Sequence, residues 1–201
     1  MDYIERVCNS KRICILNSRY SSGKEFLMTE ILWHGRGGQG AFTAARLLGA
    51  AFALKCDESY ALAFPSFGPE RRGAPIRAFT KLDNKPIGNR SEVERADFSI
   101  FLDDTLFSNA AFGELKDGGK ILLNTKKSVD DERVITLDAD KIAAEILKLP
   151  ITNTIMLGAF AAVFDRISLD DIENAIRLNM PEKLHAKNIA AVKKAAEEVN
   201  P

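Results

Sequence analysis

The chain has 201 residues, somewhat more than the roughly 150 residues typical of one domain, which predicts one principal domain with additions. Hydrophobic residues make up 46% and charged residues 28%, so the composition excludes a disordered or low-complexity chain. The 28 Lys and Arg balance the 28 Asp and Glu, which leaves a net charge of zero. A chain without net charge has no general electrostatic attraction to nucleic acids or to membrane surfaces.

Two further absences limit the function. The longest apolar stretch, residues 155–164, is far shorter than the roughly 20 residues that span a bilayer. The three cysteines, Cys8, Cys14 and Cys56, form no CxxC pair and are too few for a four-thiolate iron–sulfur cluster. Because we also find neither a disulfide framework nor a signal peptide, we expect a cytoplasmic protein that holds no metal centre of its own.

The predicted elements alternate between strands and helices. Residues 1–27 show no clear period and are interpreted as an N-terminal appendage, with Met28 as a candidate natural start and residues 28–201 as the principal domain. The strands are expected at residues 31–34, 60–64, 76–81, 86–88, 98–102, 121–123 and 134–137. The helices are expected at residues 41–54, 109–115, 141–147, 155–164, 169–178 and 183–199. This order predicts a layered α/β fold with a largely parallel sheet.

Two turns complete this prediction. Residues 83–85 are expected to connect residues 76–81 and 86–88 in an inserted antiparallel hairpin, and Gly118 with Gly119 is expected to turn the chain before residues 121–123.

The first strand is followed by a glycine-rich loop, Gly35-Arg36-Gly37-Gly38-Gln39-Gly40. This GxGxxG sequence lies where a strand ends and a helix begins. Glycine lets the backbone turn tightly and approach a ligand, and the amides at the start of a helix favour an anionic oxygen. The loop is therefore a candidate phosphate site, although the motif alone is weak and a purely structural turn is the alternative.

A second loop follows the second strand and contains Phe64, Phe67, Glu70, Arg71 and Arg72. If the first two strands run parallel, their loops share the carboxyl edge of the sheet and can face one ligand. The adjacent arginines are suited to phosphate oxygens because the guanidinium is planar and always charged. The alternative is a surface salt bridge of Glu70 with Arg71 or Arg72.

A dinucleotide site would require an acidic residue at the carboxyl end of the second strand. Asp57 and Glu58 have about the expected distance along the chain from the glycine loop, but they precede the second strand. This position disfavours a nicotinamide or flavin site. Three other polar residues have simple structural interpretations: His34 as a hydrogen-bonded structural histidine, and Asp103 with Asp104 as caps of the following helix.

The sequence resembles the gamma subunit of 2-oxoacid:ferredoxin oxidoreductases, such as pyruvate synthase. The resemblance covers about residues 30–199, and its two long ordered motifs make it much more specific than GxGxxG alone. It is carried by residues 33–40, 63–75, 90–91, 102–103 and 153–159.

The resemblance implies a subunit of a complex that decarboxylates a 2-oxoacid, transfers the acyl group to coenzyme A and passes electrons to ferredoxin. It implies that thiamine diphosphate and the iron–sulfur clusters belong to partner subunits of alpha, beta and delta type, and that this chain is inactive alone. In single-chain relatives, the region that corresponds to Gly35–Gly40 contributes to coenzyme A binding, and the loop that corresponds to residues 69–72 lies beside it.

We therefore expect the site to comprise Gly35, Arg36, Gly37, Gly38, Gln39, Gly40, Arg71 and Arg72, with no catalytic residue and no metal ligand. In this hypothesis the loop amides and the side chains of Arg36 and Gln39 contact the pyrophosphate of coenzyme A, and Arg71 or Arg72 contacts a phosphate at the adenosine end. Two alternatives remain: an assembly subunit that binds no ligand, and an independent dinucleotide-dependent oxidoreductase.

Overall fold

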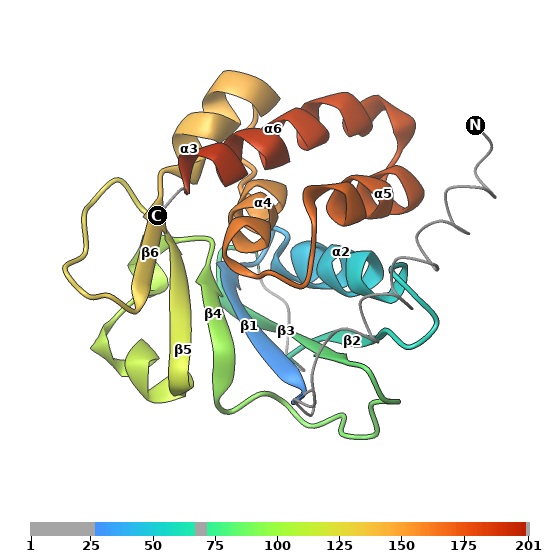
Figure 1. Cartoon of the computed structure of the whole chain (residues 1–201). Coiled ribbons are helices and arrows are strands. Elements are labelled where there is room, and N and C mark those ends of the chain that lie inside the picture. Colours follow the sequence, from blue (N-terminus) through green and yellow to red (C-terminus); the bar gives the residue numbers. More distant parts are fainter. Residues whose placement is uncertain (1–26, 67–71, 200–201) are drawn as a thin grey trace.

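A computed structural model describes residues 27–66 and 72–199, in which a six-stranded mixed sheet is covered by helices (Figure 1). The strand order is β2-β3-β1-β4-β5-β6. Strand β3 runs antiparallel to both of its neighbours, whereas β1, β4, β5 and β6 pair in parallel. The strands are β1 (Thr29–Arg36), β2 (Tyr60–Pro65), β3 (Pro75–Asp83), β4 (Ala96–Phe101), β5 (Leu115–Asn124) and β6 (Val134–Leu137).

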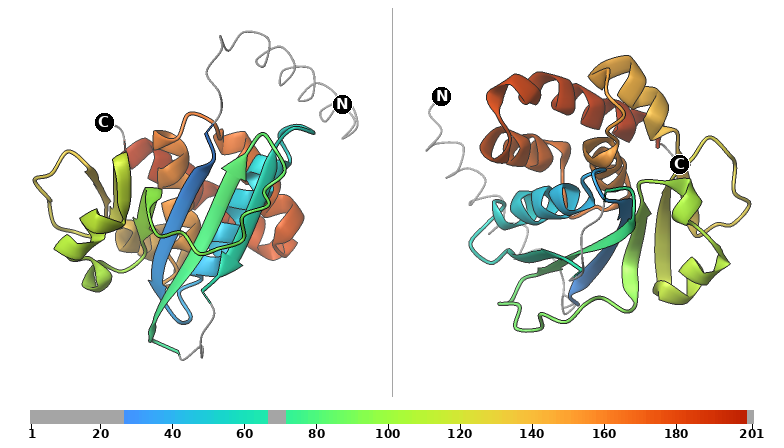
Figure 2. Two further views of the ribbon diagram at one scale, coloured as in Figure 1. Left: turned by 90° about the horizontal axis from the view of Figure 1, so that it is seen from below. Right: turned by 180° about the vertical axis from the view of Figure 1, so that it is seen from behind.

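The main helices form one layer on one face of the sheet, as the view from behind in Figure 2 shows. They are α2 (Ala41–Ala53), α3 (Ala139–Ile142), α4 (Asn153–Val163), α5 (Leu169–Asn179) and α6 (His185–Glu198). Short helical turns complete the chain at η1 (Asp104–Leu106), η2 (Asn109–Glu114), η3 (Ala143–Leu147) and η4 (Glu182–Leu184). The opposite face of the sheet is crossed by the loop over residues 84–95 (Figure 2), from which Val93 packs against Leu32 and Phe79.

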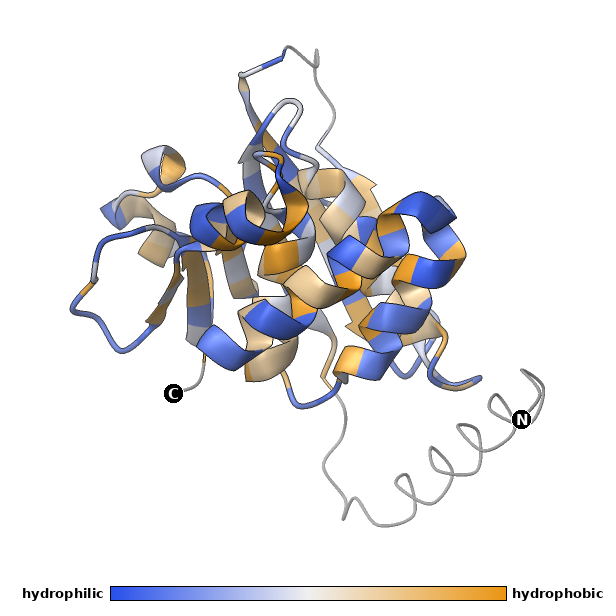
Figure 3. Cartoon of the chain, turned by 90° about the horizontal axis from the view of Figure 1, so that it is seen from above, coloured by the Kyte–Doolittle hydropathy of each residue, from blue (hydrophilic) through white to orange (hydrophobic). Residues whose placement is uncertain are grey.

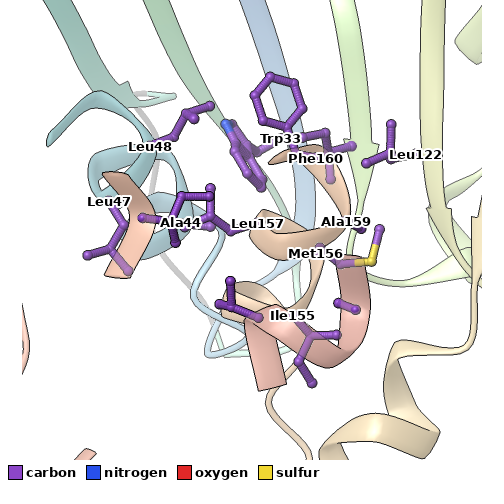
Figure 4. Close-up of a cluster of buried hydrophobic side chains, with 14 of the residues drawn as sticks. Trp33, Ala44, Leu47, Leu48, Leu122, Ile155, Met156, Leu157, Ala159 and Phe160 are labelled. Carbon is purple, nitrogen blue, oxygen red and sulfur yellow. The ribbon is translucent and has the colours of Figure 1, made fainter. Parts of the chain in front are cut away.

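The core lies between the sheet and the helical layer. Helix α4 contributes a continuous run of buried side chains that pack toward Trp33 of β1 and Leu122 of β5 (Figure 4). Trp33 is fully buried, and its indole Nε1 donates a hydrogen bond to Thr80 Oγ1 at 3.1 Å. The Thr80 hydroxyl in turn donates to the carbonyl oxygen of Ala45 in α2 at 3.0 Å, so the polar atoms in this part of the core are paired.

The amino-acid composition of each helix matches how deeply the helix is buried. Helix α2 is rich in alanine, which favours helix formation and lets the helix lie close to β2 and β3. Helices α5 and α6 alternate buried and exposed residues, so their hydrophilic residues face outward, as Figure 3 illustrates. No helix among residues 27–66 and 72–199 is long and apolar enough to cross a membrane.

The predicted fold class is confirmed, but the antiparallel hairpin was assigned to the wrong strands. Residues 86–88 form no strand; β3 pairs instead with β2, which precedes it in the chain. Local turn residues at 83–85 suggested a short hairpin, whereas the actual pairing uses the longer connection over residues 66–74. The pattern of turn residues therefore identified a bend but not the pairing partner.

Two other local predictions were wrong. Gly118 and Gly119 do not turn the chain before a strand; they lie inside β5, where the register to β4 shifts between Ala96 and Phe98. The pairing is irregular here, and Gly118 has a positive φ of 77°. The helix expected at 109–115 is the 3-10 helix η2, and Leu115 already belongs to β5.

The sheet topology determines which loops can share a site. Since β3 is antiparallel to both β1 and β2, those two strands run in the same direction, and their carboxyl ends lie at one edge of the sheet. Strand β3 begins at this edge, with Pro75 opposite Arg36. The connections after β1, β2 and β4 therefore start from the same edge.

The contact between α4 and α6 predicts a sensitive position at Gly158. A Cβ atom there would lie 2.3 Å from the carbonyl oxygen of Val192, so the two helices would have to separate. We expect Gly158→Ala to lower the free energy of unfolding by about 1 to 3 kcal/mol, as overpacked cores do. Chemical denaturation of the full chain measures this change.

Gly49→Ala in α2 is the matched control. Its added Cβ would meet Ala61 at an ordinary 3.5 Å, and alanine is a better helix former than glycine. Equal losses of stability in the two variants would contradict the packing explanation.

Candidate functional site

The glycine-rich loop connects the central strand β1 directly to α2. The loop is closed by a hydrogen bond from the Gln39 amide to the Arg36 carbonyl oxygen at 2.9 Å. Gly38 and Gly40 have φ values of 100° and 80°, which residues with a side chain rarely adopt. At Gly40 a Cβ atom would also lie 2.4 Å from Asn153 Nδ2. The glycines at these two positions are therefore required by the backbone.

The segment before β3 lies against this loop. The Gly37 amide donates to the Ala74 carbonyl oxygen at 2.9 Å, and the Gly73 amide donates to the Gly37 carbonyl oxygen, also at 2.9 Å. Gly37 and Arg72 form an isolated parallel bridge. The predicted meeting of the two loops at one edge of the sheet is confirmed for Arg72–Ala74. Arg71, Phe67 and Glu70 lie outside the described residues.

Arg36 and Gln39 are both attached to Asp103, which follows β4. Asp103 Oδ2 accepts hydrogen bonds from Arg36 Nε at 3.0 Å and from Gln39 Nε2 at 3.2 Å. Two further N–H groups of the Arg36 guanidinium donate to the Gly73 carbonyl oxygen and to Thr105 Oγ1. Gln39 Oε1 accepts from the backbone amide of Arg36 at 2.7 Å. These two side chains thus brace the loop from within the chain, and a direct contact with phosphate remains a proposal.

Asp103 also caps η1, as the sequence predicted. Its Oδ1 accepts from the Thr105 amide at 3.0 Å. Burial by itself raises the pKa of the Asp103 carboxyl, but the hydrogen bonds from Thr105, Gln39 and Arg36 outweigh burial and hold the pKa below its usual value of 3.8. The carboxylate is therefore ionised and compensates the charge of Arg36 at neutral pH.

The loop presents backbone donors at the start of a helix. Within the described part of the chain, the amides of Gly38 and Gly40 donate to no acceptor. The first turn of α2 carries no acidic residue and no side-chain cap, so nothing from this helix neutralises its positive end. Unpaired backbone amides at the positive end of a helix favour an anionic ligand, so this loop is a candidate anion site. Arg72 is exposed beside them.

His34 lies beneath this edge, on the face of the sheet away from the helices. It is buried, its ring stacks on Phe101 with centroids 4.1 Å apart, and its Nε2 lies 3.1 Å from Glu114 Oε2. This contact with His34, together with the nearby Arg77, lowers the pKa of the Glu114 carboxyl although burial opposes it. The expected structural role of His34 agrees with this setting.

Two residues that contribute to the site were not predicted from the sequence. Asp103 was interpreted only as a cap, and Asn153 only as part of a motif. Asn153 Nδ2 donates to the Gly40 carbonyl oxygen at 3.3 Å from the start of α4. The relevant signal for Asp103 was its position after a buried strand, but the adjacency of β4 to β1 cannot be read from local patterns. Neither residue is close to the loop in sequence.

The acidic residues expected of a dinucleotide site lie elsewhere. Asp57 and Glu58 precede β2 and are therefore at its amino end, opposite the edge that carries the glycine loop. Strand β3 also separates β2 from β1. The geometry thus disagrees with the standard dinucleotide-binding arrangement. Among residues 27–66 and 72–199, no group of three or more His, Cys, Asp or Glu side chains could hold a metal ion.

The fold and this site define an α/β domain whose glycine loop is a candidate anion site outside the usual dinucleotide arrangement. The sequence profile of the pyruvate ferredoxin/flavodoxin oxidoreductase family matches residues 30–198. The chain therefore belongs to this family.

Two curated relatives cover most of the chain. The chain is 47% identical to a pyruvate synthase subunit PorC from Methanothermobacter thermautotrophicus, over 86% of this chain and 96% of that protein. It is 41% identical to the common subunit gamma of the pyruvate/ketoisovalerate oxidoreductases of Pyrococcus furiosus, over 85% of this chain and 97% of that protein.

Two solved structures share the fold. The pyruvate oxidoreductase subunit PORC from Thermotoga maritima superposes with a TM-score of 0.74 at 34% identity and covers 86% of this chain and 97% of that chain. A 2-oxoglutarate:ferredoxin oxidoreductase from Magnetococcus marinus, solved with coenzyme A bound, has a TM-score of 0.70 at 17% identity. The match to this second structure covers 88% of the present chain but 32% of that one, and it supports the fold alone.

The ionised state of Asp103 predicts a pH-dependent contribution to stability. Because its pKa is lowered in the folded chain, this contribution is fully present above the unfolded pKa of about 3.9 and is lost as the pH falls through the folded pKa. At pH 7 we expect Asp103→Asn to reduce the free energy of unfolding by about 1 to 3 kcal/mol, since it weakens charged hydrogen bonds.

Urea denaturation of both proteins from neutral pH down to about pH 3 measures this difference, which should shrink steadily at the acidic end. Asp130→Asn, in the exposed loop before β6, is the control and should match the wild type throughout. A loss of stability in Asp103→Asn that stays constant with pH would contradict the stabilising role of the ionised carboxylate.

Proposed function

We propose that the chain is the gamma subunit of a 2-oxoacid:ferredoxin oxidoreductase, with pyruvate as the first candidate substrate. In the assembled enzyme a 2-oxoacid is oxidatively decarboxylated, its acyl group is transferred to coenzyme A, and ferredoxin is reduced. The named relatives support this assignment, since they are subunits of pyruvate synthase and of pyruvate/ketoisovalerate oxidoreductases. Partner subunits of alpha, beta and delta type hold the thiamine diphosphate and the iron–sulfur clusters, and the complex is cytoplasmic.

This chain supplies part of the coenzyme A site and contacts between subunits. The observation that carries the proposal is the backbone pairing of Gly37 with Gly73 and Ala74, which brings the glycine loop and Arg72 together at one edge of the sheet. Coenzyme A carries a pyrophosphate and a further phosphate at its adenosine end. The amides of Gly38 and Gly40 and the side chains of Arg36 and Gln39 are assigned to the pyrophosphate. Arg72, or the neighbouring Arg71, is assigned to the other phosphate.

The chemistry of this chain is binding and orientation. No residue of the site is a nucleophile or a general base, so no catalytic residue is assigned. Fixing the phosphates at the sheet edge restricts the flexible pantetheine arm, whose thiol then reaches the acyl group held by a partner subunit. The choice of 2-oxoacid belongs to the partner subunits, in line with a relative named as common to two such oxidoreductases.

Replacement of Arg72 tests whether this residue binds coenzyme A. In the assembled complex, Arg72→Ala should raise the KM for coenzyme A about 10- to 150-fold, because a hydrogen bond to a charged group contributes about 1.5 to 3 kcal/mol. The KM for pyruvate should not change. Steady-state reduction of ferredoxin at varied coenzyme A concentrations measures both constants.

Arg95→Ala is the matched control, since Arg95 is an exposed arginine just before β4, at the opposite edge of the sheet. It should leave both constants at the wild-type values. An unchanged KM for coenzyme A in Arg72→Ala would remove Arg72 from the site.

A change in the loop itself distinguishes a ligand site from an assembly subunit that binds nothing. Gly38→Val places a branched side chain at a φ of 100° and should distort the amides that face the ligand. We expect the coenzyme A affinity of the assembled complex to fall at least tenfold, about 1.4 kcal/mol, in isothermal titration. Assembly with an unaltered affinity would instead favour the purely structural role.

A further inference from the structure

Asp103 connects three segments that are distant in sequence. Through Arg36 it is joined to the end of β1, through Gln39 to the turn before α2, and through its own backbone to β4 and η1. Arg36 extends the connection to the Gly73 carbonyl oxygen at 3.1 Å. One carboxylate is thus the common point of attachment for the glycine loop and, through Arg36, for the segment that carries Arg72.

The hydrogen-bonding capacity of the carboxylate is directed at the protein. Oδ2 accepts from Arg36 and Gln39, and Oδ1 accepts from the amide and hydroxyl of Thr105. The side chain is only 17% exposed, and its charge would repel a phosphate at short range. Direct contact with an anionic ligand is therefore excluded for Asp103, and any influence on binding passes through the groups it holds.

The groups that Asp103 holds determine the shape of the loop. Gln39 is fixed at both ends of its amide, since Nε2 binds Asp103 and Oε1 accepts from the Arg36 amide. Gly38 and Gly40, whose amides have no acceptor among the described residues, flank Gln39. Binding of an anion by backbone amides requires those amides to be aimed in advance, because a flexible loop would lose entropy on binding.

We infer that Asp103 is a positioning residue for the phosphate-binding loop, acting through Arg36 and Gln39 to aim the amides of Gly38 and Gly40. The inference rests on the proposed function, because it concerns the same coenzyme A site. It extends that function in one respect: the specificity of the loop for the phosphate end of the ligand depends on a carboxylate that does not touch the ligand.

The competing explanation is that Asp103 serves only to cap η1. Asp103→Ser separates the two roles. Serine is among the best capping residues, so the hydrogen bond to the Thr105 amide is preserved. Its side chain is too short to hold Arg36 and Gln39 as the carboxylate does. Asp103→Asn serves as a second variant, because it keeps the size of the side chain and removes its charge.

The experiment compares two acyl acceptors in the assembled complex. Coenzyme A carries the phosphates, whereas pantetheine has the same thiol arm without them. For Asp103→Ser and Asp103→Asn we expect the KM for coenzyme A to rise about tenfold, as for misaligned hydrogen bonds to a charged group, with kcat at saturation within about twofold of wild type. The kcat/KM for pantetheine should stay unchanged.

Asp104→Asn is the matched control. Asp104 is the neighbouring aspartate, and its Oδ2 accepts from Thr125 Oγ1 at 2.9 Å, away from the glycine loop. This variant should leave the KM for coenzyme A and the kcat/KM for pantetheine at the wild-type values.

Two results would overturn the inference. One is a wild-type KM for coenzyme A in Asp103→Ser, which would reduce Asp103 to a cap. The other is an equal loss of kcat/KM with coenzyme A and with pantetheine, which would indicate general structural damage. The proposed function is tested separately: if Arg72→Ala raises the KM and Asp103→Ser does not, only the positioning role fails. If neither changes it, the coenzyme A assignment fails as well.

Discussion

The candidate site depends on two backbone hydrogen bonds between Gly37 and the segment Gly73–Ala74. They join the residue that follows β1 to the segment that precedes β3. Without them, the glycine loop and Arg72 would be separate surface segments. Because these bonds join main-chain atoms, they fix the distance between the two segments whatever the side chains around them do.

The antiparallel insertion of β3 explains why this loop differs from a dinucleotide site. In the usual arrangement the second strand lies next to the first and presents an acidic residue to a ribose. Here β3 occupies that place, and its amino-terminal segment brings Arg72 to the glycine loop. A guanidinium replaces a carboxylate beside the loop, which is the basis of the proposed preference for a phosphate over a ribose hydroxyl.

Charge in the site is organised in two layers. The inner layer contains Arg36 and Asp103, which compensate each other and hold the loop together. The outer layer contains the amides of Gly38 and Gly40 and the exposed Arg72. A compensated inner pair holds the loop without adding net charge, and in the proposed function the outer donors provide the attraction for the phosphates. Arg36 and Gln39 belong to the inner layer through their hydrogen bonds to Asp103, and the proposed contact with the pyrophosphate uses the N–H groups that these bonds leave over.

The sequence by itself determined the alternation of strands and helices, the glycine loop at the end of β1 and the resemblance that placed the chain in its family. These features are encoded locally, in hydrophobic periodicity, in turn residues and in ordered motifs. The sequence did not determine that β2 is the partner of β3, that the pairing of β5 is irregular near Gly118, or that Asp103 holds Arg36 and Gln39. These features depend on the strand order and on contacts between residues that are far apart in the chain. Several strand pairings are compatible with the local patterns. Only the tertiary structure decides which of them buries the core and pairs the backbone hydrogen-bonding groups.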